Sequence, residues 1–294
     1  MKLDIYKGEM ILSIEPTRTI GLILASVVAN FRDSLLEGLS NQFHEKGYRL
    51  IMGLTDHSID REKEYLEQFA SITDCIIVVS SAEKYEDIAP AISGDVPVLF
   101  LLNKPEDCPY TCILESDYSA IYQAVVSCTN MEHVKVGCIC SHRELSSTKE
   151  FLRAYKDAMS ASPASYSEDL IYDIENDMDF NVHELVLDMA YKGCSTILAA
   201  TPAITNRIID YLVFYNTNPL NTPISLFGYG TTGNSLSSQM NIDVIMHPVN
   251  QLVNLTVQQA IYLINHPDYT NQRDFLIKGS LRMHTYDGLH TLKN

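Results

Sequence analysis

The chain is poor in basic residues. Its 294 residues include 21 lysines and arginines against 37 aspartates and glutamates, which gives a net charge of −16. Proteins hold nucleic acids and anionic membranes chiefly through clustered lysine and arginine side chains. The charge therefore argues against either partner being held by these residues alone.

Long apolar runs are also missing. None approaches the roughly 20 residues that cross a bilayer. Residues 1–16, MKLDIYKGEMILSIEP, contain neither the apolar core nor the small-residue cleavage site of a signal peptide. We expect no membrane partner and a cytoplasmic protein.

No C-x-x-C pair occurs among the cysteines. They are Cys75, Cys108, Cys112, Cys128, Cys138, Cys140 and Cys194. Their number is odd and most lie in apolar runs, which is typical of reduced core thiols. Cys108 and Cys112 have no accompanying histidine or second cysteine pair, so the sequence predicts no metal centre there.

Motifs of catalysis are absent too. The sequence contains no G-x-x-x-x-G-K-[ST], G-x-S-x-G or H-E-x-x-H motif. Gly228, Gly230 and Gly233 have the spacing of a dinucleotide fingerprint, but a poor helix follows and no acid lies about twenty residues further on, so a loop is favoured. The histidine and acids of residues 183–188 fit a solvated helix face better than a metal site. We expect neither an enzyme nor a cofactor.

The sequence does contain a regular alternation of apolar strands and amphipathic helices. It begins with a strand over residues 19–26 and a helix whose apolar stripe includes Leu35, Leu39 and Phe43. Short strand–helix connections indicate parallel sheets covered by helices on both faces. Because the alternation restarts at residue 134, we predict an α/β fold of two doubly wound parallel-sheet lobes joined by a multi-strand hinge, of the periplasmic-binding-protein-like type I.

The expected domain boundaries follow from this alternation. Residues 1–18 are expected to be a linker remnant. The N-terminal lobe is expected to contain residues 19–133 and 249–270, and the C-terminal lobe residues 134–248 and 271–294. No Gly/Ser-rich linker divides them, which favours a tight hinge that the chain crosses more than once.

Ligands of such folds bind beyond the carboxyl ends of the parallel strands. The candidate ligand-binding residues at these ends are Ser26, Asp56, Ser80, Asn103, Thr201, Tyr229 and Gly230. Phe31 and Arg32 join them at the turn after the first strand. Arg32 stands at a helix N-terminus, where it suits a carboxylate or phosphate ligand; a surface arginine on an amphipathic helix is the alternative.

Residues 17–39, TRTIGLILASVVANFRDSLLEGL, resemble the start of the effector-binding core of lactose/galactose-repressor (LacI/GalR) family transcription regulators. The resemblance continues in the family's order through VPVLFLL, SDYSAIYQAV, EHVKVGCI, FLRAYKDAM, STILAAT and PISLFGY. It covers nearly all of residues 17–285.

This resemblance implies an effector-binding and dimerisation domain of a repressor. A small molecule, sugar-like or anionic, is expected to bind in the cleft between the lobes of a homodimer and to control operator binding allosterically. The family's helix-turn-helix headpiece has about sixty residues and is not found here. We therefore expect operator contact only through a headpiece absent from this chain, whether truncated, replaced or never present.

Several positions depart from the sugar-responsive members of the family. Phe151 stands where those members have an arginine that grips the ligand, and Thr201 and Gly230 replace polar ligand-binding residues. Sugar hydroxyls are costly to desolvate unless donors and acceptors meet them. The departures imply a less polar effector than a hexose, or a degenerate site.

A periplasmic-type solute-binding protein is the alternative function, because it shares the fold. It requires export, and the lack of a signal sequence and the seven cysteines count against it.

The charge balance leads to a test on DNA. The 294-residue chain should not retain operator DNA, because few lysines and arginines are present to neutralise phosphates. A gel-shift titration checks this, and tight sequence-specific retention would contradict it.

Overall fold

The computed structural model describes most of the chain. The described residues are 2–6, 9–13, 16–25, 29–94, 96–129, 135–162, 166–177, 179–215, 224–230, 243–267 and 273–282. The side chains of residues 2–6, 9–13, 29–32 and 213–215 lie outside the description.

The chain divides into two compact units. Unit 1 contains Met1–Val27, Leu35–Leu114 and Asn250–Phe275, and unit 2 contains Val28–Ser34, Glu115–Val249 and Leu276–Asn294. Each unit holds one six-stranded, predominantly parallel sheet. The predicted fold class of two doubly wound α/β lobes is therefore confirmed.

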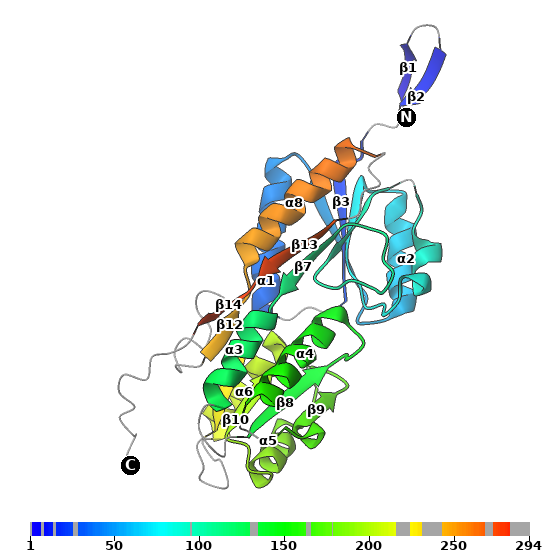
Figure 1. Ribbon diagram of the computed structural model, residues 1–294. Coiled ribbons are helices and arrows are strands. Elements are labelled where there is room, and N and C mark those ends of the chain that lie inside the picture. The colour runs from blue at the N-terminus through cyan, green and yellow to red at the C-terminus, as the bar shows by residue number, and fades with distance from the viewer. Residues whose placement is uncertain are drawn as a thin grey trace. The chain divides into compact units, whose positions relative to one another are not determined.

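Unit 1 is built on a sheet with the strand order β13-β7-β6-β5-β3-β4. Its elements are β3 (Thr19–Leu24), α1 (Ala29–Glu45), β4 (Arg49–Leu54), α2 (Ile59–Ala70), β5 (Cys75–Val79), the 3₁₀ helices η1 (Tyr85–Asp87) and η2 (Ala89–Ala91), β6 (Val98–Leu101), β7 (Cys112–Ser116), α8 (Val249–Asn265) and β13 (Asp274–Lys278). Figure 1 shows α1 and α8 on one side of this sheet and α2 on the other. Every residue of β3, β5 and β6 is buried because both faces are covered, which explains their continuous apolar sequences.

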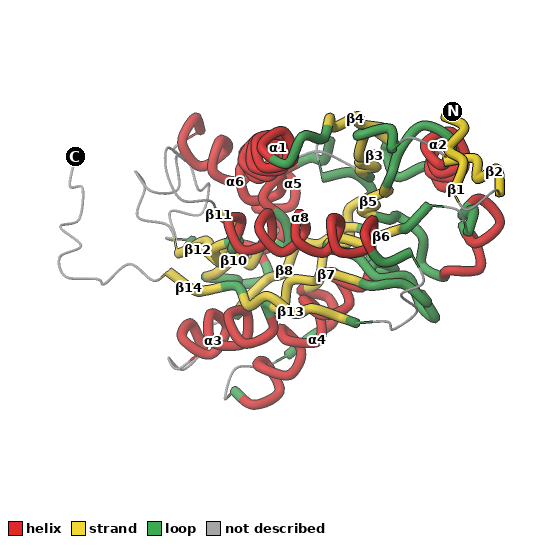
Figure 2. Tube along the Cα trace, turned by 90° about the horizontal axis from the view of Figure 1, so that it is seen from above, coloured by secondary structure: helices red, strands yellow, loops and turns green. Residues whose placement is uncertain are grey.

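Unit 2 has the strand order β14-β12-β11-β10-β8-β9. Its elements are α3 (Tyr118–Thr129), β8 (Val136–Ser141), α4 (Ser146–Ala161), the 3₁₀ helix η3 (Glu168–Leu170), β9 (Ile171–Ile174), α5 (Val182–Tyr191), β10 (Thr196–Ala199), α6 (Pro202–Tyr215), β11 (Ser225–Gly230), β12 (Asp243–Met246) and β14 (Ser280–Arg282). Figure 2 shows α3 and α4 on one face of the sheet and α5 and α6 on the other. Side chains alternate along β11, so Phe227 and Tyr229 join the core under α3 and α4 while Leu226 joins the core under α5 and α6.

Three segments carry the chain from one unit to the other. Apart from the start of α1, which groups with unit 2, the changes fall at residues 114–115, 249–250 and 275–276. The first lies inside β7 and the third inside β13. Gly279 separates β13, in the sheet of unit 1, from β14, in the sheet of unit 2.

The structure differs from the sequence-based expectation in five respects. Strand β7 was not predicted, and α3, expected within the lobe of residues 19–133, groups with unit 2. Residues 271–294 were expected in one lobe, but β13 belongs to the sheet of unit 1 and β14 to the sheet of unit 2. Helix α1 begins at Ala29, so Phe31 lies within the helix rather than at the turn before it. The expected linker 1–18 contains an antiparallel hairpin of β1 (Lys2–Tyr6) and β2 (Glu9–Ser13).

Among the described residues, no helix combines the length and the apolar character that a membrane crossing needs.

Candidate functional site

Three of the candidate residues follow strands of the unit 1 sheet. Asp56 follows β4 and is exposed, with a backbone φ of 53° that places it in the left-handed region. Asn103 follows β6 and is 8% exposed. Ser80 follows β5 and is completely buried. Because parallel strands end at the same edge of a sheet, these residues lie along that one edge.

The hydroxyl of Ser80 is engaged within unit 1. It donates to Glu62 Oε1 over 2.5 Å, and the backbone N–H of Ser81 donates to Glu62 Oε2 over 2.9 Å. Burial raises the pKa of the Glu62 carboxyl, although these two hydrogen bonds lower it. Ser80 therefore holds the end of β5 against α2. The Ser81 hydroxyl lies 3.4 Å from Nδ1 of His57, which follows β4, the next strand but one in the sheet.

The structure does not describe the side chains of the candidates that follow β3. Ser26 lies outside the described residues. Phe31 and Arg32 lie in α1, but their side chains are outside the description. Their predicted ligand contacts stay predictions.

Four candidates lie in unit 2, and two of them pack together. Phe151 on α4 and Tyr229 on β11 are buried, with ring centroids 6.5 Å apart. Gly230 ends β11 beside them. Thr201 has a different role, because its hydroxyl donates to Asp177 Oδ2 over 2.8 Å and accepts from the N–H of Ile204, which caps α6.

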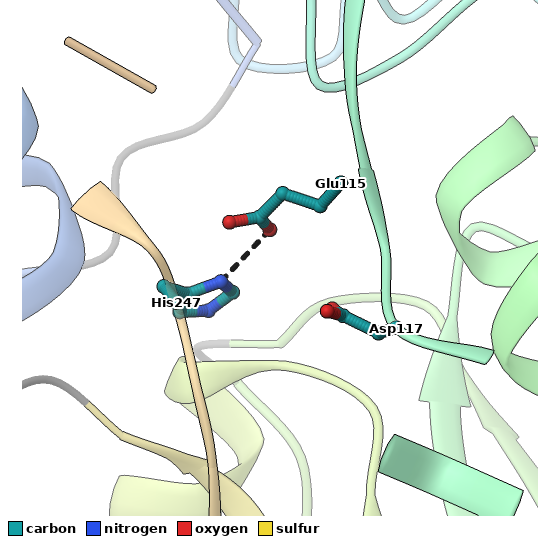
Figure 3. Close-up of side chains that lie close together, drawn as sticks. All are labelled: Glu115, Asp117 and His247. Carbon is teal, nitrogen blue, oxygen red and sulfur yellow. Dashed lines mark hydrogen bonds and ion pairs between the residues drawn. The ribbon is translucent and has the colours of Figure 1, made fainter. Parts of the chain in front are cut away.

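Tyr229 leads to a buried ionisable cluster that the sequence did not predict. Its ring stacks on the imidazole of His247, with centroids 4.8 Å apart. His247 Nδ1 lies 2.8 Å from Glu115 Oε2, and the Tyr229 hydroxyl donates to Asp117. Figure 3 shows the Glu115 and Asp117 side chains directed toward the imidazole. All of these residues belong to unit 2.

Burial and charge shift the protonation of this cluster. Burial and the neighbouring Glu115 carboxylate raise the pKa of Asp117 to about 7, against smaller opposing effects of His247 and the Tyr229 hydrogen bond. Burial lowers the pKa of His247, but the carboxylates of Glu115 and Asp117 outweigh it, so the net shift is upward. Burial and the neighbouring carboxylates therefore favour the protonated forms of Asp117 and His247.

Asp117 is also in close contact with the backbone of Gly279. A Cβ atom at Gly279 would lie 2.0 Å from Asp117 Oδ1. The φ of Gly279 is outside the left-handed region, so space and not backbone conformation requires glycine here.

The sequence carried a signal for this cluster. Glu115 and Asp117 are two residues apart, so on an extended segment they share one side. Recognising CILES as a strand would have shown this, and His247 directly follows the apolar residues of β12. The burial of these side chains comes from contacts with other parts of the chain, such as Gly279 against Asp117 and Tyr229 against His247, and no local sequence pattern indicates it.

No protein-family model matches the chain. Two curated relatives are the HTH-type transcriptional repressor PurR of Aliivibrio salmonicida and the ribose operon repressor of Bacillus subtilis. The first is 24% identical over 164 residues, 55% of this chain and 49% of the relative. The second is 31% identical over 110 residues, 37% of this chain and 33% of the relative. The aligned part of the chain is therefore similar in sequence to transcriptional repressors. It spans about half the length, or less, of the curated relatives it matches.

Solved structures of transcription regulators share the fold. The Cra regulator of Pseudomonas putida, in complex with fructose 1-phosphate, has a TM-score of 0.77 at 15% identity, covering 91% of this chain and 98% of that one. A probable LacI family regulator from Corynebacterium glutamicum has a TM-score of 0.74 at 18% identity, covering 90% and 96%. The resemblance inferred from the opening residues is thereby confirmed.

The protonation of the cluster makes stability depend on pH. A carboxyl whose folded-state pKa is raised stabilises the fold fully below its unfolded-state pKa, and the contribution is lost as the pH rises through the folded-state value. For Asp117 this window runs from its ordinary value of 3.8 to about 7. The raised pKa of His247 likewise contributes stability that is lost as the pH rises, in a window that begins at its ordinary value of 6.5.

We therefore expect the Asp117→Asn variant, which stays neutral at every pH, to gain stability relative to the wild type between about pH 5 and pH 8. Urea unfolding in metal-free buffer at both pH values measures the difference. A constant difference between the two proteins would show that Asp117 does not titrate in this window.

The contact at Gly279 gives a second prediction. Gly279→Ala should lower the free energy of unfolding by about 1–3 kcal/mol, because the new methyl group overlaps the Asp117 carboxylate. The Gly94→Ala control should be near neutral, since no atom lies within 4 Å of that Cβ position. Urea denaturation of both variants, repeated with Asp117→Ala, measures the effect. An undiminished loss in the Asp117→Ala background would exclude the proposed overlap.

Proposed function

We propose that the chain is the effector-binding and dimerisation core of a LacI-family transcriptional repressor. The observation that carries the proposal is the combination of repressor relatives with two doubly wound units that share three connecting segments. In this proposal a small molecule binds between the units and favours one arrangement of them. Coupling of this kind is typically worth about 1–3 kcal/mol, or a 5- to 150-fold change in affinity for the second ligand, here operator DNA.

The proposed effector is sugar-like or an anionic metabolite. The structural neighbours with bound sugars support this class: the Pseudomonas putida regulator holds fructose 1-phosphate. A periplasmic binding protein/LacI regulator from Alkaliphilus metalliredigens holds D-xylulofuranose, with a TM-score of 0.68 at 20% identity and coverage of 90% of this chain and 97% of that one. For this chain, Arg32 is the proposed cation for a carboxylate or phosphate, at the N-terminal turn of α1.

The remaining proposed contacts come from both units. Asp56 and Asn103 lie at the strand ends of unit 1, and Phe151 and Tyr229 supply apolar and aromatic surface in unit 2. Ser80 and Thr201 contribute by holding their strand ends, because their hydroxyls already have partners. Two of the described candidate hydroxyls are therefore already engaged, which supports an effector with a charged group rather than a plain hexose.

A thermal-shift screen tests the proposal. Sugars, sugar phosphates, nucleobases and amino acids are each added to the 294-residue chain, with fructose 1-phosphate as the first probe. A ligand of the proposed class should raise the melting temperature, because binding to the native state alone stabilises it by mass action. The Arg32→Ala variant should lose the shift for anionic ligands.

The matched control is Arg61→Ala, an exposed arginine in the first turn of α2. It should keep the full shift. A shift that survives in Arg32→Ala would identify Arg32 as a surface residue, and a chain that responds to no member of these classes would refute an effector of the proposed kind.

A further inference from the structure

Glu115, Asp117 and His247 have the composition and spacing of a metal-ion site. Each offers one ligand atom, and the three atoms lie within 4.8 Å of one another. The side chains of His247 and Glu115 are 8% and 12% exposed, and Asp117 is 8% exposed. The three side chains converge from two separate chain segments, as Figure 3 shows.

Two carboxylate oxygens in this group have no hydrogen-bond partner among the described residues. They are Glu115 Oε1 and Asp117 Oδ1, both inaccessible to solvent. Buried polar atoms are nearly always hydrogen-bonded, and a charged one without a partner is especially costly. The cluster therefore contains two hydrogen-bond acceptors for which the described residues supply no donor. A bound cation would satisfy both.

We propose that Glu115, Asp117 and His247 bind a single divalent transition-metal ion, with Zn²⁺ the preferred one. One imidazole nitrogen and two carboxylate oxygens match the ligands of Zn²⁺, which takes nitrogen and oxygen at about 2.0–2.2 Å in tetrahedral geometry. Mg²⁺ and Ca²⁺ prefer oxygen ligands and bind imidazole nitrogen poorly. The set of three protein ligands leaves the fourth position for water.

Small side-chain movements bring the ligands to bonding distance. Ligand atoms around a tetrahedral Zn²⁺ lie roughly 3.3–3.6 Å apart, so the longest present separation of up to 4.8 Å must contract by about 1 Å. Glu115 can supply this by rotation of its side chain. The other two ligands are already oriented: Tyr229 donates to Asp117 and stacks on the His247 ring. Outer contacts of this kind fix ligands in known metal sites.

The test uses the full 294-residue chain after treatment with a chelator and removal of that chelator. Isothermal titration with ZnCl₂ should show one ion bound per chain. His247→Gln and Asp117→Asn should each weaken binding by about tenfold or more, the range found when metal-site partners are changed. Titration with MgCl₂ should show no comparable binding.

His183→Gln and Asp188→Asn are the matched controls. They change the same residue types on α5 in the same unit, where His183 contacts the Tyr211 hydroxyl and Asp188 pairs with Lys192. Both controls should bind Zn²⁺ as the wild type does. Equal weakening by control and site variants, or no stoichiometric binding by the wild type, would overturn the proposal.

A second measurement needs no variant. X-ray absorption at the zinc edge of the wild-type complex should report imidazole nitrogen and oxygen neighbours and no sulfur. A spectrum with sulfur ligands would place the ion on the cysteines, for example Cys108 and Cys112, and would overturn the proposal even if the substituted proteins failed to fold.

Discussion

His247 and Glu115 form a buried hydrogen bond. Glu115 is the first residue of unit 2 after the junction at residues 114–115, and His247 lies two residues before the junction at residues 249–250. Breaking a buried pair by removing one partner generally costs about 3–5 kcal/mol, because the other charge stays buried without compensation. The third junction segment reaches the same place through Gly279, whose backbone lies against Asp117. The end of β7, the end of β12 and the start of β14 are thus held together by one group of side chains.

Specific residues are needed around this group of side chains, for steric or electrostatic reasons. Gly279 leaves room for the Asp117 carboxylate. Glu150, from α4, accepts from the N–H of Tyr118 and from the Ser116 hydroxyl, so the first turn of α3 has a side-chain acceptor from another helix. The Asp117 carboxyl is engaged by the Tyr229 hydroxyl.

Much of the fold could be predicted from the sequence, because covered parallel strands such as β3 and β5 leave continuous apolar runs. Strand β7 was missed because Cys112–Ser116 is short and half polar. That omission also placed α3 in the expected first lobe. In the site, strand ends were predictable, but the partners of Ser80 and Thr201 were not, since Glu62 and Asp177 come from elements far along the chain. The Glu115, Asp117 and His247 cluster was missed for the same reason.

The three junctions have a consequence for synthesis on the ribosome. Unit 1 is not contiguous: its helix α8 and part of β13 are translated only after nearly all of unit 2. Until then the face of α1 around Gly38, which packs against Val253 of α8, has no cover. The nascent chain must therefore keep an unfinished N-terminal core in water while nearly all of the second core is synthesised, a state in which exposed apolar surface favours chaperone binding.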